Sequence, residues 1–197
     1  GVNKMSAMIS KELRALGFSA HQLPQVEVGN IHYYSNTIDE NIDVLLLGNV
    51  DNLTKLSNQK YYRETEQRIY GTGIWEHKGG LVTMIAALQG LRFVRQLKKI
   101  KIGILLTSDD SLQGQFAKPF VDKYSQNSRI VLGMHGAFID GGIVTSRSGS
   151  ARYKFNMQLV DTDSAENVAK AVTVYTHLIH SWTKLSRPED GMLVTPH

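Results

Sequence analysis

Apolar and polar positions recur along this chain with two different periods. A helical period over residues 3–16 predicts an amphipathic helix that Gly17 ends. Residues 18–28 and 31–35 are expected to form two strands, because the dipeptide Gly29-Asn30 between them is a strong turn signal. The chain therefore begins with a helix followed by a pair of strands.

The next segments are continuous apolar runs rather than alternating ones. Residues 42–48 contain Val44-Leu-Leu-Leu47, and residues 101–107 form a second run of this kind. Such runs are typical of strands that are buried on both faces of a parallel sheet. A third apolar strand is expected at residues 129–134. The helical segments between these strands are residues 79–97 and 115–124. The order predicts an α/β fold with a mixed, largely parallel sheet and helices on both faces.

The pattern changes after Arg147-Ser-Gly149. Residues 151–160 alternate between apolar and polar, which is typical of a half-exposed strand. Asp163-Ser-Ala-Glu166 is a capping-box sequence that predicts the start of a helix, and a short strand is expected at residues 192–195. These patterns divide the chain into two predicted domains: an α/β domain at residues 1–147 and a partial α+β domain at residues 148–197.

The composition is that of an ordinary globular protein, since 42% of the 197 residues are hydrophobic and 20% are charged. The chain contains no cysteine, which excludes disulfides, cysteine-bound zinc and thiol catalysis and fits a cytoplasmic location. No apolar stretch reaches the roughly 18 residues that a membrane span needs, so no membrane partner is expected. Because residue 1 is Gly rather than Met, a fragment of a longer protein is one interpretation of this sequence.

The net charge of +4 raises the question of nucleic-acid binding. The densest basic stretch, residues 92–101, lies where a predicted helix ends, and cations at that position interact favourably with the helix dipole. The chain contains no DNA-binding motif. We therefore expect no nucleic-acid partner.

One carboxylate stands in a glycine-rich segment that leads into a helix. Glu76 lies within Gly71-Thr-Gly-Ile-Trp-Glu-His-Lys-Gly-Gly80. Gly79 and Gly80 have no β-carbon, so another part of the backbone can approach the helix start closely. A carboxylate beside a helix start attracts a cation or a polar ligand, and Glu76 is therefore a candidate site residue.

Polar residues also follow each of the three predicted apolar strands. In open α/β sheets, ligands bind beyond the carboxyl ends of the strands. The segments at these ends are Gly48-Asn-Val-Asp51, Thr107-Ser-Asp-Asp-Ser111 and Met134-His-Gly136. We expect them to converge with Glu76 on one crevice.

In order and spacing these segments resemble the cocatalytic zinc metallopeptidases that include aminoacylase, glutamate carboxypeptidase and succinyl-diaminopimelate desuccinylase. That family has His-x-Asp after an apolar strand, then Gly-x-Gly-x-x-Asp-Met-Lys-Gly-Gly at a helix start. Asp-Glu-Glu follows the next strand, an Asp or Glu follows the one after, and Arg-Lys-Gly leads into a lid domain. The resemblance implies a zinc-peptidase-like catalytic domain followed by a partial lid domain, through which the chain could form a homodimer.

The resemblance also implies a role for four residues. Asp51 matches the Asp that orients a metal ligand, and Asp110 matches the general base. Glu76 matches the Asp that bridges the two zinc ions, and His135 matches a further metal ligand. A metal ion in this family polarises the scissile carbonyl and acidifies a water molecule.

Two other ligand positions are changed. Asn49 stands where the family has a zinc-binding His, and Ser111 stands where it has a zinc-binding Glu. Two divalent cations need several anionic ligands, so a paired zinc site is not expected. The alternative is a single zinc ion held by three side chains, namely Glu76, His135 and either Asp51 or Asp110.

Each candidate also has a structural interpretation. Ser111 is most simply a helix N-cap, and Asp51 could cap a local turn. His135 could be a hydrogen-bonded structural histidine. His77 should point away from its neighbour Glu76 and is not a candidate.

Three hypotheses about function follow from these residues. The preferred one is a metallopeptidase-like domain whose zinc-dependent amide hydrolysis is impaired or lost and which is retained for binding or assembly. The second is an active zinc carboxypeptidase or N-acyl amino acid deacylase with a rebuilt or mononuclear site, acting on a small peptide or N-acyl amino acid. The third is an unrelated α/β domain that binds an anion at the helix start around Gly79 and Gly80.

Overall fold

The computed structural model describes residues 1–23, 31–52, 61–136, 141–145, 156, 158 and 164–186. The chain separates into two compact units, Gly1–Gly142 and Ile143–His197. Three features predicted above lie outside the described residues: the turn at Gly29-Asn30, the segment Arg147-Ser-Gly149 and the strand at residues 192–195. The strand predicted at residues 151–160 also lies outside them, except for positions 156 and 158. The domain boundary between residues 147 and 148 therefore stays a prediction.

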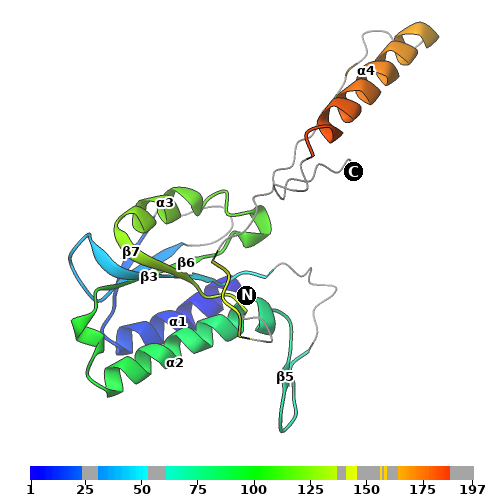
Figure 1. The fold of residues 1–197 in the computed structure, drawn as a ribbon. Helices are drawn as coiled ribbons and strands as arrows, with labels where there is room; N and C mark the ends of the chain where they lie inside the picture. Colours follow the sequence, from blue (N-terminus) through cyan, green and yellow to red (C-terminus); the bar gives the residue numbers. More distant parts are fainter. Residues whose placement is uncertain are drawn as a thin grey trace. The chain divides into compact units, whose positions relative to one another are not determined.

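The first unit is built on a five-stranded mixed sheet with the strand order β1-β2-β6-β3-β7 (Figure 1). Its strands are β1 (Ser19–Gln22), β2 (His32–Ser35), β3 (Ile42–Asn49), β6 (Ile102–Thr107) and β7 (Ser128–Gly133). Strand β3 is central and pairs in parallel with both β6 and β7. The pairs β1–β2 and β2–β6 are antiparallel. The predicted fold class is confirmed.

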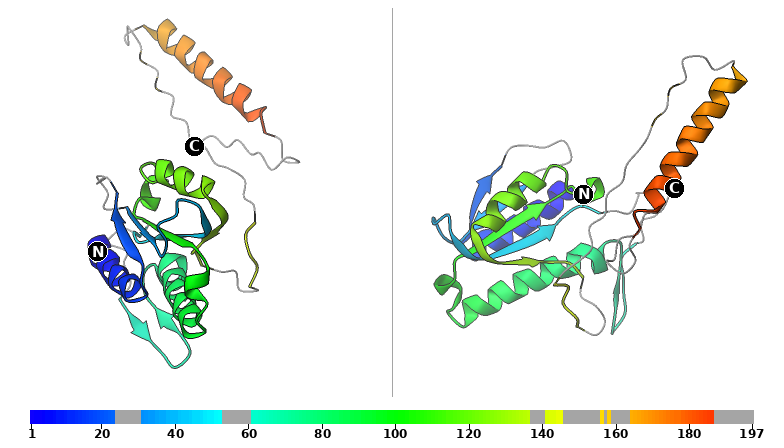
Figure 2. Two further views of the ribbon diagram at one scale, coloured as in Figure 1. Left: turned by 90° about the vertical axis from the view of Figure 1, so that its left-hand side faces the viewer. Right: turned by 45° about the horizontal axis from the view of Figure 1, so that its top comes forward.

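Helices cover both faces of this sheet (Figures 1 and 2). The helices of the first unit are α1 (Val2–Ala15), α2 (Gly79–Phe93) and α3 (Lys118–Gln126). Short 3₁₀ turns, η3 (Leu97–Lys99) and η4 (Asp110–Leu112), flank β6. Helices α1 and α2 lie on one face and α3 lies on the other (Figure 1). The predicted helices are therefore present, with boundaries that differ by a few residues.

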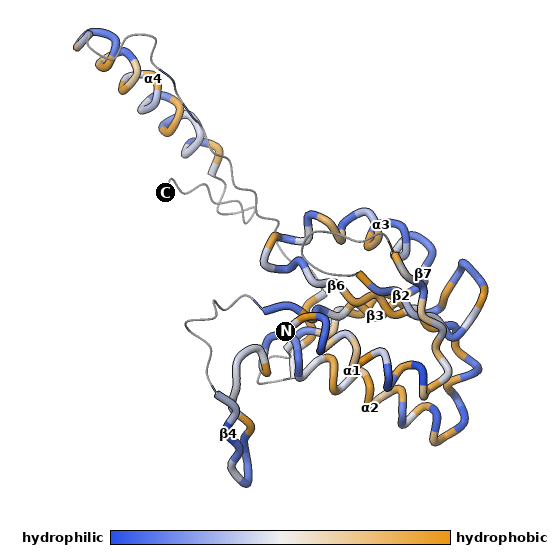
Figure 3. Tube along the Cα trace, turned by 180° about the vertical axis from the view of Figure 1, so that it is seen from behind, coloured by the Kyte–Doolittle hydropathy of each residue, from blue (hydrophilic) through white to orange (hydrophobic). Residues whose placement is uncertain are grey.

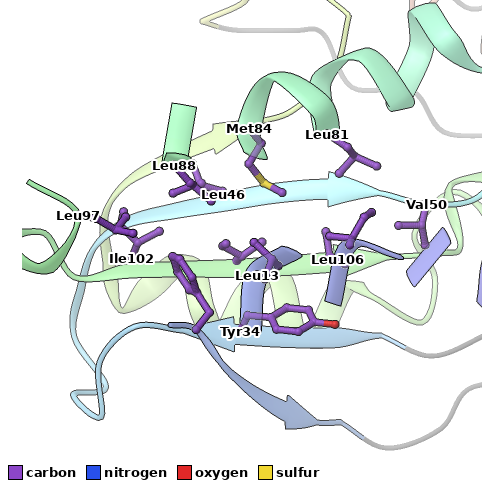
Figure 4. Packing of buried hydrophobic residues seen from close by; sticks show 13 residues of the cluster. Leu13, Tyr34, Leu46, Val50, Leu81, Met84, Leu88, Leu97, Ile102 and Leu106 are labelled. Carbon is purple, nitrogen blue, oxygen red and sulfur yellow. The ribbon is translucent and has the colours of Figure 1, made fainter. Parts of the chain in front are cut away.

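Two hydrophobic clusters hold the helices to the sheet. The larger one joins α1 and α2 to one face of β2, β3 and β6, and Leu13, Met84 and Leu106 are among its members (Figure 4). The smaller one lies under α3 and includes Leu45 and Leu105. Because Leu45 and Leu46 belong to different clusters, β3 is buried on both faces, as its apolar run predicts. Figure 3 shows the matching hydrophobic stretches along β3 and β6.

Strand β7 is different, although its sequence is as apolar as that of β3. It lies at the edge of the sheet, and Ile130, Val131 and Leu132 are 54%, 40% and 45% exposed. Neighbouring residues of a strand point to opposite faces, so both faces of β7 carry exposed apolar side chains.

A small hairpin and a fourth helix are also present in the described chain. Strands β4 (Arg63–Glu64) and β5 (Ile69–Tyr70) form a small antiparallel hairpin between β3 and α2. In the second unit, helix α4 (Ala165–Thr183) begins after Ser164, whose hydroxyl accepts a hydrogen bond from the backbone N–H of Asn167. The helix was predicted to open at Asp163, so the observed cap lies one residue later.

Candidate functional site

The three polar segments predicted to form a crevice lie at one edge of the sheet. Parallel pairing sets Asn49 opposite Thr107, and it sets Leu47 opposite Gly133. The carboxyl ends of β3, β6 and β7 therefore lie side by side, which is where ligands bind in open α/β sheets.

The segment after β3 is buried and internally bonded. The side-chain oxygen of Asn49 accepts a hydrogen bond from the backbone N–H of Asp51 at 3.4 Å. One carboxylate oxygen of Asp51 accepts a hydrogen bond from the backbone N–H of Ser111 at 3.1 Å. Its other oxygen is buried and has no hydrogen-bond partner among the described residues. Asp51 thus links the end of β3 to the turn after β6.

The segment after β6 contains a buried carboxylate that accepts hydrogen bonds from the backbone. Asp109 is 1% exposed, and its Oδ2 accepts hydrogen bonds from the backbone N–H groups of Phe116 and Ala117, both at 2.8 Å. These N–H groups lie at the start of α3, so the Asp109 side chain closes that helix end. The interpretation of Ser111 as the helix N-cap is wrong, since Ser111 lies in η4 and α3 begins at Lys118.

Glu76 lies in a π-helical turn, η2 (Ile74–Lys78), that leads directly into α2. The turn is closed by the i→i+5 hydrogen bond from Lys78 N to Gly73 O at 3.0 Å, and Gly73 adopts the left-handed conformation with φ 72°. Within this turn Glu76 is exposed, whereas His77 is buried.

His77 is a candidate site residue that the sequence reasoning set aside. Its Nε2 lies 3.3 Å from Oδ2 of Asp110, and its ring meets the ring of His135 edge-on with 5.3 Å between centroids. The Asp110 side chain is 37% exposed, and His135 is exposed. Neither ring nitrogen of His77 makes a hydrogen bond to the described residues. The signal was present in the motif: His77 stands where the family pattern has Met, an apolar residue suited to a buried position.

Backbone contacts bring η2, α2 and the segment after β7 together. A β-carbon on Gly80 would overlap the carbonyl group of Met134, and one on Gly136 would overlap the carbonyl oxygen of Trp75. The N–H of Gly136 also donates a hydrogen bond to the carbonyl of Glu76 at 3.2 Å. The close approach expected at the start of this helix is therefore present at Gly80.

Several buried polar atoms at this edge of the sheet have no hydrogen-bond partner among the described residues. Asp51 and Asp109 each keep one buried oxygen without a partner, and His77 has two unbonded nitrogens, within the described part of the chain. Unpaired buried atoms of this kind favour a polar ligand or an ion. Among the described residues, however, no group of three or more His, Asp or Glu side chains is arranged to hold a metal ion.

Together, the parallel strand ends and the polar residues beyond them define an α/β domain with its candidate site at the carboxyl edge of the sheet. No family model matches the sequence. Over 112 residues the sequence is 30% identical to a probable succinyl-diaminopimelate desuccinylase of Staphylococcus aureus (strain MRSA252). The matched segment covers 57% of this chain and 25% of the desuccinylase.

Solved structures agree with that match. Human carnosine dipeptidase 1 superposes on 69% of this chain with a TM-score of 0.58 and 15% identity, using 33% of its own length. The M20 family metallo-carboxypeptidase Sso-CP2 from Sulfolobus solfataricus covers 72% of this chain with a TM-score of 0.58 and 15% identity, using 34% of its length. The di-peptidase Dug1p from Saccharomyces cerevisiae covers 65% with a TM-score of 0.53 and 14% identity.

The chain has the fold of the M20 family of metallopeptidases, and the resemblance seen in the sequence is confirmed. The alternative of an unrelated α/β domain is therefore wrong. The chain spans about a quarter of the desuccinylase and about a third of the solved peptidases that it matches. Of the helices that the structure describes, none combines the length and apolar character that crossing a membrane requires.

Proposed function

We propose that this chain is a metallopeptidase-like domain whose two-zinc amide hydrolysis is impaired or lost, and that its strand-end site is retained for binding or assembly. One observation carries the proposal. The residues at the family's ligand positions are committed to structure or turned outward: Asn49 bonds to the backbone of Asp51, while Glu76 and His135 are exposed.

Charge supports the loss of the two-zinc cage. Two divalent cations require several anionic ligands to offset the hydration that they give up. Asn49 and Ser111 are neutral, and the Ser111 backbone already donates to Asp51. Losing even an outer-shell partner of a metal ligand costs roughly 10- to 100-fold in affinity, so replacing two direct ligands should cost far more.

A weakly active site with one zinc ion is the second candidate, and one observation favours it. His77 approaches both Asp110 and His135, so the general-base position and a ligand position lie in the same neighbourhood. The ligands would be Glu76, His135 and either Asp51 or Asp110, since a His with two carboxylates is an accepted zinc ligand set. A zinc ion bound there would polarise a carbonyl group, while Asp110 would hold the proton of the attacking water.

Homodimer formation through helix α4 belongs to the same proposal. Val168, Val172 and Tyr175 recur at helical spacing and are 42%, 60% and 48% exposed. Such an apolar face on a described helix without buried residues is suited to an interface. A cytoplasmic location without nucleic-acid or membrane partners completes the proposal, and it rests on composition alone.

The metal content of the full-length protein tests the main proposal. We expect less than one zinc ion per chain by mass spectrometry after dialysis against a buffer without chelator. Two zinc ions per chain that survive dialysis, together with hydrolysis of N-acyl amino acids, would contradict it. A single retained ion that is lost in His135→Ala would favour the second candidate.

Restoring the ligands provides a sharper test. The double variant Asn49→His with Ser111→Glu should raise zinc affinity by at least about tenfold, because the strand ends remain in place and one ligand accounts for at least this factor. The matched control is Asn52→His, a change of the same type three residues away. An equal gain in the control would point to unspecific zinc binding, and no gain in the double variant would mean that the crevice geometry differs from that of the active peptidases.

A further inference from the structure

A polar groove lies between helix α1 and the strand pair β1–β2. Its volume is about 410 Å³, which falls within the range of small-molecule sites. The polar side chains that line it come from three elements: Asn3, Ser6, Ser10 and Arg14 from α1, His21 from β1, and His32 and Tyr34 from β2. None of these residues belongs to the candidate site at the strand ends.

The polar stripe on α1 follows from the helical period. Ser6, Ser10 and Arg14 are each four residues apart and therefore lie along one side of the helix. The neighbouring side carries Ile9 and Leu13, which are buried in the larger hydrophobic cluster. The apolar side thus holds α1 on the sheet, and the polar stripe is left facing the groove.

The groove is positively charged. Arg14 carries the permanent charge, and its Nε donates a hydrogen bond to the hydroxyl of Ser10 at 3.3 Å. No Asp or Glu is found among the described residues that line the groove. Burial lowers the pKa of His32, so its ring is neutral at neutral pH and acts as a hydrogen-bonding group.

Ser6 adds an independent observation. Its side chain lines the groove and is 5% exposed, and its hydroxyl has no hydrogen-bond partner within the described part of the chain. Leaving a buried hydroxyl unpaired is unfavourable, whereas a bound oxyanion would accept its hydrogen bond.

We propose that this groove binds a small oxyanion, that is, the phosphate or carboxylate group of a small molecule. Arg14 supplies the charge and its planar donors, which match the geometry of phosphate and carboxylate oxygens. Ser6 and Ser10 donate from the same helix, with the Asn3 amide at its first turn. Helix α1 thereby gives the first unit a second ligand site that is separate from the peptidase-like edge.

The test is an NMR titration of the full chain with sodium phosphate and, separately, with sodium acetate, against sodium chloride at equal ionic strength. We expect saturable shifts of the α1 and β1–β2 amides with at least one of the two anions. Arg14→Gln should weaken this binding by about tenfold, the usual effect of removing a charged hydrogen-bond donor. The control Lys11→Gln removes the same charge from the exposed side of α1 and should leave the affinity unchanged.

Ser6→Ala separates binding from folding. Removing an unpaired buried hydroxyl should not lower the melting temperature, yet it should weaken anion binding by about threefold. The proposal is overturned if neither anion gives saturable shifts, or if Arg14→Gln and Lys11→Gln weaken binding equally. Preference for phosphate over acetate, or the reverse, identifies which oxyanion the groove accepts.

Discussion

The polar side chains at the carboxyl edge of the sheet divide into two halves with different environments. On the β3–β6 side, Asn49, Asp51 and Asp109 are buried and accept hydrogen bonds from the backbone. On the α2–β7 side, Glu76 and His135 are exposed. The same kinds of side chain thus serve as structural acceptors in one half and stay available in the other.

This difference separates side chains that folding requires from side chains that only a ligand would require. A carboxylate that closes a helix end is required for folding whether or not a metal ion binds. A carboxylate on an exposed turn is required only if it contacts a ligand. Substitutions of the buried acceptors should therefore lower the stability of the fold, whereas substitutions of the exposed side chains should change only ligand binding.

The largest effect is expected for Asp109→Ala. The substitution leaves the N–H groups of Phe116 and Ala117 without their acceptor. We expect the free energy of unfolding to fall by about 3 kcal/mol, measured by urea denaturation. Asp122→Ala, at an exposed position of α3, is the control. A loss below about 1 kcal/mol would show that these bonds are not what holds α3 in place.

Gly80→Ala should come next, at about 2 kcal/mol, because the new methyl group would overlap the carbonyl of Met134. Gly90→Ala in the same helix is the matched control, since a β-carbon there meets nothing within 4 Å. That control should stabilise the protein by up to about 1 kcal/mol through helix propensity. Equal effects of the two substitutions on the melting temperature would refute the close contact between α2 and the segment after β7.

Asp51→Ala should cost about 1.5 kcal/mol, since the Ser111 N–H loses its acceptor while the unpaired second oxygen is removed at the same time. Thermal unfolding followed by circular dichroism measures the change. Asp51→Asn keeps one acceptor oxygen and should lose less. If both variants were as stable as the parent chain, the link between the ends of β3 and β6 would be unimportant for folding.

The smallest effect is expected for Glu76→Ala, within about 0.5 kcal/mol, because the side chain is exposed on its turn. If the crevice binds a peptide or an ion, this variant should still change the affinity measured by calorimetry. A destabilisation comparable to that of Asp51→Ala would place Glu76 in the structural half and remove the contrast.

Most of the fold could be predicted from the sequence because periodicity and composition agree locally. The apolar runs at residues 42–48 and 101–107 gave the central strands, and Gly79 marked the start of α2. The order of the polar segments gave the correct edge of the sheet. The environment of β7 could not be predicted, because an apolar run indicates what a strand is suited to contact and not what lies beside it.

The direction of the side chains just before α2 could not be predicted from the sequence, because the turn that carries them is π-helical. The sequence interpretation placed Glu76 at the site and set His77 aside. In a π turn each hydrogen bond spans one residue more than in an α-helix, so the direction of every side chain before α2 changes. Glu76 became exposed and His77 became the buried neighbour of Asp110. The Met that the family pattern has at position 77 indicated a buried side chain there, but no local pattern indicated the π-helical turn itself.

Strand β7 has a practical consequence for work with this polypeptide. Among the described residues no strand pairs with its outer edge, Ile130, Val131 and Leu132 are exposed, and Arg129 is the one charged residue of the strand. Natural sheets usually protect their edge strands with lysines, prolines or bulges, and unprotected edge strands pair with the edge strands of other molecules. Samples of this length should therefore scatter more light as they are concentrated, and a charge placed at Val131 should keep them clear.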